Sequence, residues 1–427
     1  MPRRFDRSTA HLARAEATIP LGAQTFSKSR TQYPVGFAPL FATRGKKAHL
    51  WDIDGNRFVD LVAALGAVTI GYCDRQIDSA VRKQMRCGVT FSLSSKIESE
   101  VAELLTSLLP DAEMVRFAKN GSDVTSAAIR LARHVTGKKL VVRSSYHGWH
   151  DWYIGSTSRN SGVPREVSDL TLVLPFNNLE EAEKIFDESG DQISCIILEP
   201  LGMDFPIPGF LSGLRKLCDK HGALLIFDEV VTGFRVSKAG AGSLFGVSAD
   251  ISCFGKGIAN GYPLSAIVGK KQYMKELTEV FFSGTFGGET LSLAAAQKVL
   301  DLVEKGQIVE RLEDIGGDLE QRIQKLLTDN QFSFLQLSGH PAWKFLKWNV
   351  EPLYLDEVKT LFLQEMMKEG ILILNTFNIM TSLSSRDIAK IEDAFANVLP
   401  KLQYSLKTGD FKRYLQAETI KPLFKIR

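Results

Sequence analysis

Short apolar runs alternate with amphipathic stretches through the middle of the chain. Ser122 to Thr136 keeps apolar residues at helical spacing behind a capping residue, so we expect a helix there. The apolar runs are short and continuous, which is typical of strands buried on both faces of a parallel sheet. We expect such strands at KKLVVRS, Ser194 to Pro200, Ala223 to Val230 and Asp250 to Lys256, with a further apolar run at Pro263 to Gly269. This alternation predicts an α/β domain.

The pattern changes near residue 315. A long amphipathic helix, roughly Gln307 to Asp329, is followed by the strand-like stretches FSFLQLSG and WKFLKWNV and by helices near Asp356 to Glu369 and from Ser385. Near the other end of the chain, Ala48 to Val62 has the turn signal DIDGN between two apolar stretches, which predicts a hairpin. We therefore expect an N-terminal segment (1–60) that packs with a C-terminal small domain and its tail (316–427), around a large domain (61–315).

Composition and charge exclude several classes of protein. The chain has 427 residues with 52 Lys+Arg against 49 Asp+Glu, a net charge of +3, so we expect neither a nucleic-acid partner nor an anionic membrane. The longest nearly uncharged apolar stretch, Leu61 to Gly71, is too short to span a bilayer, and the N-terminus lacks the apolar region of a signal peptide. Scattered cysteines without a Cys/His cluster predict a cytoplasmic protein with no metal site.

Two apolar runs end in residues that carry chemistry. Asp228 follows the run that begins at Ala223, where a parallel strand reaches the carboxyl edge of its sheet and where ligands bind in open α/β folds. A carboxylate there is either a functional acid or a loop acid paired with Arg235. Lys256 also follows an apolar run and stands between two glycines. A desolvated lysine can be the amine of a Schiff base, although most lysines beside glycines are ordinary surface residues.

A helix N-terminus and an aromatic loop complete the candidate site. Gly121 and Ser122 lie where a loop becomes a helix, which is a seat for a phosphate or an ordinary capped start. Tyr146 or His147, after a strand, would stack on a flat cofactor ring or pack within its loop. The GxGxxG fingerprint is missing, which argues against a nicotinamide oxidoreductase. A phosphate seat, a stacking ring, an acid and an amine together fit pyridoxal 5'-phosphate (PLP).

A series of ordered motifs carries a resemblance to a known family. They are LWDIDGNRFVDLV, AEMVRFAKNGSDVTSAAIRLAR, YHGWHD, ILEP, LIFDEVVTGFR, FGKGIANGYPLSAIVG and SGTFGGET. From Ile19 to Leu399, roughly, the chain resembles the class III, fold-type I PLP-dependent aminotransferases, and within them the glutamate-1-semialdehyde 2,1-aminomutase branch. That resemblance implies an α/β fold with a mostly parallel seven-stranded central sheet flanked by helices. It also implies a smaller α+β domain built from both chain ends.

The resemblance also implies roles around the cofactor ring. Lys256 would form the internal aldimine with PLP and move a proton during the reaction. Asp228 would pair with the pyridinium nitrogen and keep it protonated. Val230 would pack on one face of the ring and Tyr146 on the other.

The remaining implied contacts surround the phosphate and the ring. Gly121 and Ser122 would bind the phosphate, and Thr285 matches a phosphate-binding threonine that reaches over from a neighbouring subunit. This implies a homodimer with a shared active site. His147 and Glu199 match family positions near the ring.

The departures from the family pattern cluster where substrate is recognised. GGET replaces the usual GGNP, which places Glu289 beside the cofactor loop, and the substrate loop reads GAQTFSKSR, which leaves Lys28 or Arg30 as the anion contact. Leu65 stands where the aminomutases have an aromatic residue, and Asp204 where they have an amide. We therefore expect the cofactor and the reaction class to be kept, with a substrate other than glutamate-1-semialdehyde.

The sequence thus favours an aminotransferase that moves an amino group between an amino donor and an aldehyde or keto acceptor. An aminomutase, which would use both half-reactions on one molecule, and an amino-acid racemase are alternatives on the same scaffold. A cofactor-free binding protein is a further alternative, although every cofactor position is chemically competent.

Overall fold

The computed structural model describes residues 4–421. They divide into two compact units. The smaller unit combines the chain up to Asp74 with the segment that begins at Arg311, and the larger unit runs from Arg75 to Glu310. The boundaries between the two units follow Asp74 and Glu310. From the sequence we expected these boundaries at residues 60 and 315.

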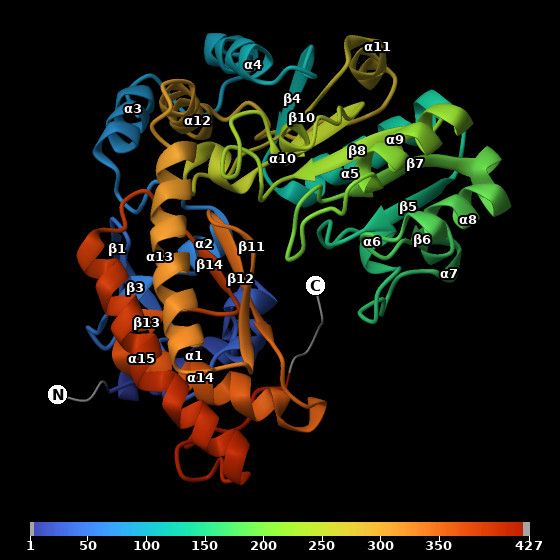
Figure 1. Ribbon diagram of the computed structural model, residues 1–427. Helices are drawn as coiled ribbons and strands as arrows, with labels where there is room; N and C mark the ends of the chain where they lie inside the picture. Colours follow the sequence, from blue (N-terminus) through green and yellow to red (C-terminus); the bar gives the residue numbers. More distant parts are fainter. Residues whose placement is uncertain (1–3, 422–427) are drawn as a thin grey trace. The chain divides into compact units, whose positions relative to one another are not determined.

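A seven-stranded sheet forms the centre of the larger unit, with the strand order β4-β10-β9-β8-β7-β5-β6 (Figure 1). Its strands are β4 (Met114–Ala118), β5 (Leu140–Ser144), β6 (Thr171–Val173), β7 (Ile193–Leu198), β8 (Leu224–Glu229), β9 (Ile251–Phe254) and β10 (Ser265–Gly269). Strands β5 to β9 pair in parallel, whereas β10 is antiparallel to both of its neighbours. This confirms the mostly parallel seven-stranded sheet that the sequence predicted.

Helices cover both faces of this sheet. The helices of the larger unit are α3 (Arg75–Met85), α4 (Lys96–Leu108), α5 (Gly121–Thr136), α6 (Asp151–Ile154), α7 (Arg165–Ser168), α8 (Leu179–Ser189), α9 (Phe210–His221), α10 (Ala241–Leu244), α11 (Lys271–Met274) and α12 (Thr290–Glu304). Every residue of β7 and β8 is buried. Alternate residues of β7 serve the two faces, because Cys195 packs in the cluster of α5 while Ile196 packs in the cluster of α8 and α9. The continuous apolar runs in the sequence follow from this double burial.

The smaller unit contains two short sheets, one of which joins the two ends of the chain. One sheet has the order β1-β2-β3-β13 and the other β11-β12-β14. The strands are β1 (Ala42–Lys46), β2 (His49–Asp52), β3 (Arg57–Asp60), β11 (Leu335–His340), β12 (Trp343–Trp348), β13 (Ile371–Leu372) and β14 (Thr376–Asn378). The hairpin predicted within Ala48 to Val62 is confirmed by the antiparallel pair β2 and β3. Since β13 pairs in parallel with β3, the smaller domain is built from both chain ends, as predicted.

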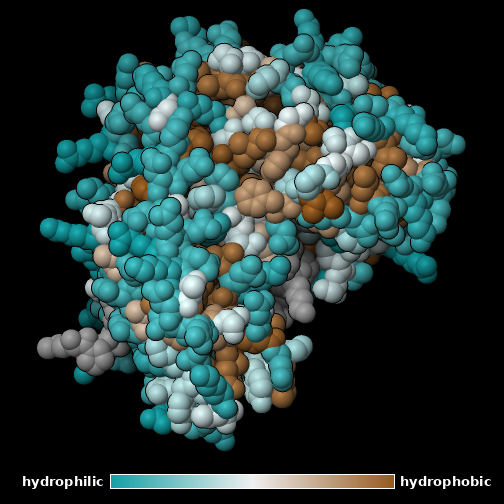
Figure 2. Space-filling view, viewed as in Figure 1, coloured by the Kyte–Doolittle hydropathy of each residue, from teal (hydrophilic) through white to brown (hydrophobic). Residues whose placement is uncertain are grey.

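The helices of the smaller unit are amphipathic. They are α1 (Asp6–Glu16), α2 (Ala63–Gly66), α13 (Val309–Asp329), α14 (Leu355–Glu369) and α15 (Ser385–Thr408). Along α13, Leu312, Leu319, Ile323 and Leu327 recur at helical spacing and are buried. On the face drawn in Figure 2, hydrophilic side chains predominate over α13 and α15. Within the part of the chain that the structure describes, no helix is both long enough and apolar enough to cross a membrane.

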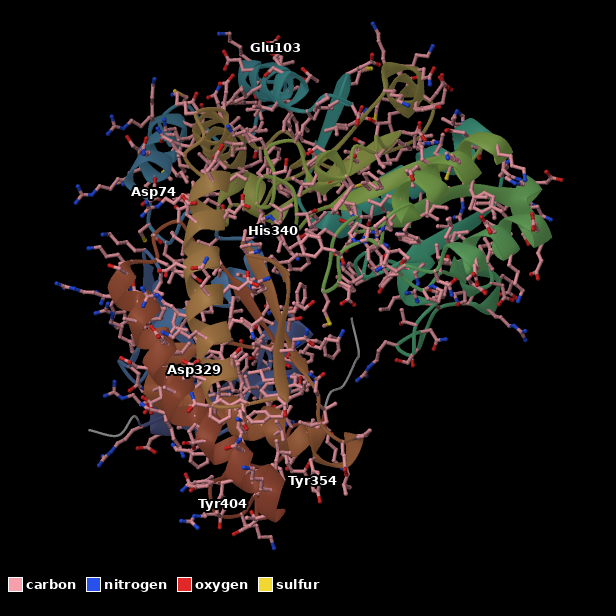
Figure 3. The ribbon with its side chains drawn as sticks, in the orientation of Figure 1. Asp74, Glu103, Asp329, His340, Tyr354 and Tyr404 are labelled. Carbon is pink, nitrogen blue, oxygen red and sulfur yellow. The ribbon has the colours of Figure 1, made fainter. Side chains whose placement is uncertain are left out.

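The C-terminal tail is docked on α14 and α15. The side chain of Gln364, buried in α14, donates a hydrogen bond from Nε2 to the carbonyl oxygen of Tyr414 at 2.8 Å. Its Oε1 atom accepts hydrogen bonds from two backbone N–H groups further along the tail. Tail rings contact the two tyrosines labelled in Figure 3, since Phe411 stacks on Tyr354 and Tyr414 meets Tyr404 edge-on. The tail is therefore an integral part of the smaller unit.

Candidate active site

The predicted cofactor residues follow the carboxyl ends of four neighbouring parallel strands. Tyr146 and His147 follow β5, Glu199 follows β7, Asp228 lies near the end of β8, and Lys256 follows β9. The register of the sheet aligns these strand ends, because residues at the ends of β5 and β8 both pair with Leu198 of β7. Parallel pairing therefore gathers side chains from distant parts of the sequence at one edge of the sheet.

A buried acid–imidazole pair lies at this edge. The Oδ2 atom of Asp228 is 2.8 Å from Nδ1 of His147, and both side chains are almost fully buried. The other imidazole nitrogen, Nε2, lies 2.7 Å from the carbonyl oxygen of Ser144, so it carries a proton and donates it. Nδ1 lies against the carboxylate of Asp228, whose oxygen atoms are hydrogen-bond acceptors like the carbonyl oxygen of Ser144. A hydrogen bond therefore links Nδ1 of His147 to the carboxyl group of Asp228 and fixes its position.

The backbone of Val230 fixes the other oxygen of this carboxylate. The N–H of Val230 donates to Oδ1 of Asp228 at 3.1 Å. The ring of His147 stacks on Trp152 and meets Tyr153 edge-on, which holds the imidazole plane in place. Fixed on both sides, the carboxylate has a defined orientation at the sheet edge.

The N-terminus of α5 offers hydrogen-bond donors at the same edge. A capping box closes the turn before it, in which a carboxylate oxygen of Asp123 accepts hydrogen bonds from the N–H groups of Lys119 and Asn120. Within residues 4–421, neither the N–H of Gly121 nor that of Ser122 has a hydrogen-bond acceptor. The Ser122 hydroxyl accepts the N–H of Trp149 at 3.2 Å, so its own proton remains to be donated. Two N–H groups and a hydroxyl at a helix N-terminus fit the phosphate group of PLP.

Three glycines let the backbone approach these side chains. A Cβ on Gly121 would come within 3.0 Å of Val230, and one on Gly255 within 3.2 Å, so Val230 lies between the start of α5 and the residue before Lys256. A Cβ on Gly148 would come within 2.2 Å of Oγ of Ser122. Gly148 was not predicted as a site residue, although a glycine directly after Tyr146 and His147 indicates a close approach of the backbone.

Lys256 has an unusual backbone conformation. It opens the short 3-10 helix Lys256–Ala259 with a φ of 40°, in the left-handed region that side chains disfavour. Its side chain is half-buried, and β9 ends two residues before it. Tyr146 is also half-buried and meets Tyr153 edge-on at 5.4 Å between ring centroids, while Glu199 is buried. A strained lysine at this edge is typical of a functional position.

The second acid of the motif, Glu229, has a structural contact that the sequence analysis did not assign. Its carboxylate is fully buried and caps α10, with hydrogen bonds from the N–H groups of Ala241 at 2.8 Å and Gly242 at 2.9 Å. It also accepts a hydrogen bond from the hydroxyl of Thr232. Burial raises the pKa of Glu229 above its ordinary value. The two adjacent acids thus have different partners, and Asp228 is the one that faces His147.

Thr285 and Glu289 lie on the loop before α12. Thr285 is exposed and lines an open hollow of about 900 Å³, together with Lys119 and Asp123 near the start of α5. Glu289 caps α12 and lies 3.0 Å from Nζ of Lys119. Burial alone raises the pKa of Glu289, but hydrogen bonds from Ser292 and Lys119 bring that pKa below its ordinary value. Its role toward substrate stays a prediction.

The two basic candidates for substrate binding lie in the smaller unit. Nε of Arg30 is 2.5 Å from a carboxylate oxygen of Glu16, so this arginine is ion-paired. Lys28 is exposed in the short 3-10 helix Phe26–Lys28. The contact of either residue with a substrate stays a prediction.

Comparison with known proteins gives the family. The profile of the family Aminotransferase class-III matches residues 32–388. A glutamate-1-semialdehyde 2,1-aminomutase of Syntrophobacter fumaroxidans is 39% identical over 327 residues, which cover 72% of this chain and 75% of that protein. A 3-aminobutyryl-CoA aminotransferase of Cloacimonas acidaminovorans is 35% identical over 332 residues, or 76% of this chain and 79% of that protein.

The solved structures agree with the sequence relatives. The PLP internal aldimine form of the FumI protein from Sphingopyxis is 25% identical to this chain with a TM-score of 0.88, and the match covers 94% of this chain and 98% of that one. The donor set described above, at the carboxyl edge of a fold-type I sheet, fits the same cofactor. This chain belongs to the class III aminotransferase family and is a PLP-dependent enzyme of fold type I.

Proposed function

We propose that this protein is an aminotransferase that moves an amino group between an amino donor and an aldehyde or keto acceptor. The observation that carries the proposal is the buried Asp228–His147 pair beside the free N–H groups of α5, at the edge where Lys256 emerges. These groups match the three chemical ends of PLP: a ring nitrogen, a phosphate and an aldehyde carbon.

Each of these residues would have a separate task. When bound, PLP supplies an electron sink for the bonds at the carbon that carries the amino group. Asp228, fixed by His147, would hold a proton at the ring nitrogen. Gly121 and Ser122 would hold the phosphate through their N–H groups and the Ser122 hydroxyl. The amine of Lys256 would bind the cofactor and then act as general base and acid at the substrate carbon.

Three further residues would hold the ring. Val230, set between Gly121 and Gly255, would pack on one face, and Tyr146 would pack on the other. Glu199, buried after β7, would lie beside the ring. In this arrangement apolar contact excludes water from the reacting atoms, and this strengthens the electrostatic interactions there.

We also propose that the enzyme is a homodimer in which Thr285 completes the phosphate site of the partner. Exposed aromatic rings on the Thr285 loop support this: Phe281 is 80% exposed, and Phe286, which lines the same hollow as Thr285, is 59% exposed. Exposed aromatic rings close together on one loop are typical of a protein–protein interface. Analytical ultracentrifugation should show a dimer that Phe281→Asp and Phe286→Asp weaken, and a wild-type monomer would contradict this arrangement.

An aminomutase is the second candidate. The identity of 39% to a glutamate-1-semialdehyde 2,1-aminomutase supports it at least as well as the relatives support a transaminase. The two functions differ in their need for a second substrate. An aminotransferase stops after one half-reaction when no carbonyl acceptor is present, whereas an aminomutase converts a single substrate without any acceptor.

The deciding experiment follows the cofactor and the acceptor separately. The purified protein should absorb visible light, and borohydride should remove that band and leave a stable pyridoxyl label on Lys256. A screen of amino donors without acceptor should convert the cofactor once, with further turnover when an aldehyde or keto acid is added. Full turnover by Lys256→Ala would refute the proposed mechanism, and turnover of one substrate without acceptor would favour the aminomutase.

A further inference from the structure

An ion pair joins two loops that lie far apart in the sequence. Nζ of Lys119 lies 3.0 Å from Oε2 of Glu289, and both side chains are largely buried, with 19% and 12% exposed. Lys119 immediately precedes the capping box of α5, and its own N–H bonds to Asp123. The lysine of this ion pair therefore lies one residue before Asn120, which caps α5 at the phosphate-binding turn.

The other end of the pair is held just as firmly. The carboxylate of Glu289 accepts hydrogen bonds from the N–H of Leu291 at 2.6 Å and from the hydroxyl of Ser292 at 2.7 Å. Glu289 ends the loop that carries Thr285, and the glycines of this loop run close to β4 and α4. A Cβ on Gly287 would lie 3.1 Å from a backbone oxygen of β4, and one on Gly288 within 2.6 Å of Glu98 in α4.

From these contacts we infer that the Lys119–Glu289 pair is a clamp that fixes the Thr285 loop against the start of α5. Both are then positioning residues for cofactor binding, since neither has to touch the cofactor. The inference rests on the proposed function, in which Gly121 and Ser122 bind phosphate in one subunit and Thr285 serves the partner. The clamp would tie together the elements that hold the phosphate groups of the two sites.

A positioning role and a purely electrostatic role predict different signs for the change in PLP affinity when Glu289 loses its charge. If the two charges acted on the phosphate through space, Lys119→Met would weaken PLP binding and Glu289→Gln would tighten it. If the pair acts as a clamp, both variants weaken binding, because either one breaks the same contact. Glutamine keeps an oxygen that can accept the N–H groups of α12, so Glu289→Gln retains the helix cap.

The test measures dissociation constants for PLP rebinding to the full-length protein stripped of cofactor. We expect Lys119→Met and Glu289→Gln each to raise the PLP dissociation constant about two- to fivefold, which is the effect of losing one partly exposed ion pair. The double variant should lose little more than either single variant, because the two residues form one contact. Pyridoxal, which lacks the phosphate, should bind all variants equally.

A matched control lies on α12 itself. Lys298 pairs with Asp301 at 3.1 Å, so Lys298→Met removes a more exposed ion pair of similar length away from the phosphate turn and should leave PLP affinity unchanged. Shifts of opposite sign in the two clamp variants, unchanged PLP affinity, or equal losses for PLP and pyridoxal would each overturn the clamp. A wild-type protein that binds no PLP would instead refute the proposed function. If Lys119→Met does not fold, Glu289→Gln decides alone.

Discussion

Gly148→Ala is a demanding test of the phosphate site, because one added methyl group strikes the Ser122 hydroxyl. Gly148 has a φ of 105°, and an ideal Cβ there would lie 2.2 Å from Oγ, 2.9 Å from Cβ and 3.1 Å from Cα of Ser122. Normal contact needs about 3.5 Å, so Ser122 or the loop of Gly148 has to move by about 1 Å. The hydrogen bond from Trp149 to the same hydroxyl would be lost with that movement.

The cost can be worked out from two contributions. Overpacking of a buried contact costs about 1–3 kcal/mol, and an alanine held at a strongly positive φ costs about 1–3 kcal/mol more. We therefore expect a loss of about 2–6 kcal/mol in the free energy of unfolding. Since Ser122 has to move, we also expect PLP to bind at least about tenfold more weakly, the equivalent of 1.4 kcal/mol.

Gly137→Ala at the other end of α5 is the matched control. Gly137 also has a positive φ, 69°, but a Cβ there would meet nothing within 4 Å. This variant should lose only about 1 kcal/mol and should bind PLP as the wild type does. Urea unfolding and PLP titration of both variants measure the two effects. If Gly148→Ala binds PLP as tightly as Gly137→Ala, the placement of Ser122 against Gly148 is wrong.

Three further predictions concern the smaller unit. Burial and Lys344 lower the pKa of His340 from 6.5 to about 4. As the pH drops from 6.5 to 4, the unfolded chain binds a proton at this histidine before the folded protein does, so the free energy of unfolding falls. His340→Leu should flatten this part of a urea-unfolding pH profile, and an unchanged slope would contradict the prediction. Gln364→Leu should release the tail, seen as faster proteolysis after residue 409, while equal cleavage rates would show that other contacts hold it. Tyr72→Phe removes the 2.6 Å hydrogen bond to buried Asp60 and should cost about 1–3 kcal/mol of unfolding free energy, and a loss below 0.5 kcal/mol would contradict this.

The sequence predicted those elements whose formation depends on local pattern. Strands β7 and β8 are buried on both faces, so most of their residues are apolar and the run is visible without any knowledge of its neighbours. The C-cap Gly222, with a φ of 60°, closes α9 and is likewise a local signal, since glycine favours this conformation at a helix end. Helix α12 was not predicted, and its N-cap is Glu289, a residue seldom used in that position. Helix α4 was missed although Ser95 and Glu98 form a readable capping box.

The candidate site likewise contains residues that a local sequence pattern reveals and contacts that only the assembled fold reveals. Asp228 and Lys256 could be found because each ends or follows an apolar run, which is a local signal. The contact of Gly148 with Ser122 and the pair of Lys119 with Glu289 could not be found, because they join segments that meet only when the sheet and its helices are assembled. The antiparallel direction of β10 is likewise a property of topology, which no run of apolar residues encodes.

The pairing of β3 with β13 sets the order in which the parts of this enzyme can fold during synthesis. Val59 and Ile371 are neighbours in the sheet but more than three hundred residues apart in the chain, so a ribosome releases β3 long before its partner exists. During that interval the segment of the larger unit emerges complete and can fold around its own core. Meanwhile the edge of β3 stays open to other chains. Stalled or truncated products that end before Ile371 should therefore aggregate through the unpaired edge of β3. The larger unit, which follows β3 in the chain, can already be folded in these products.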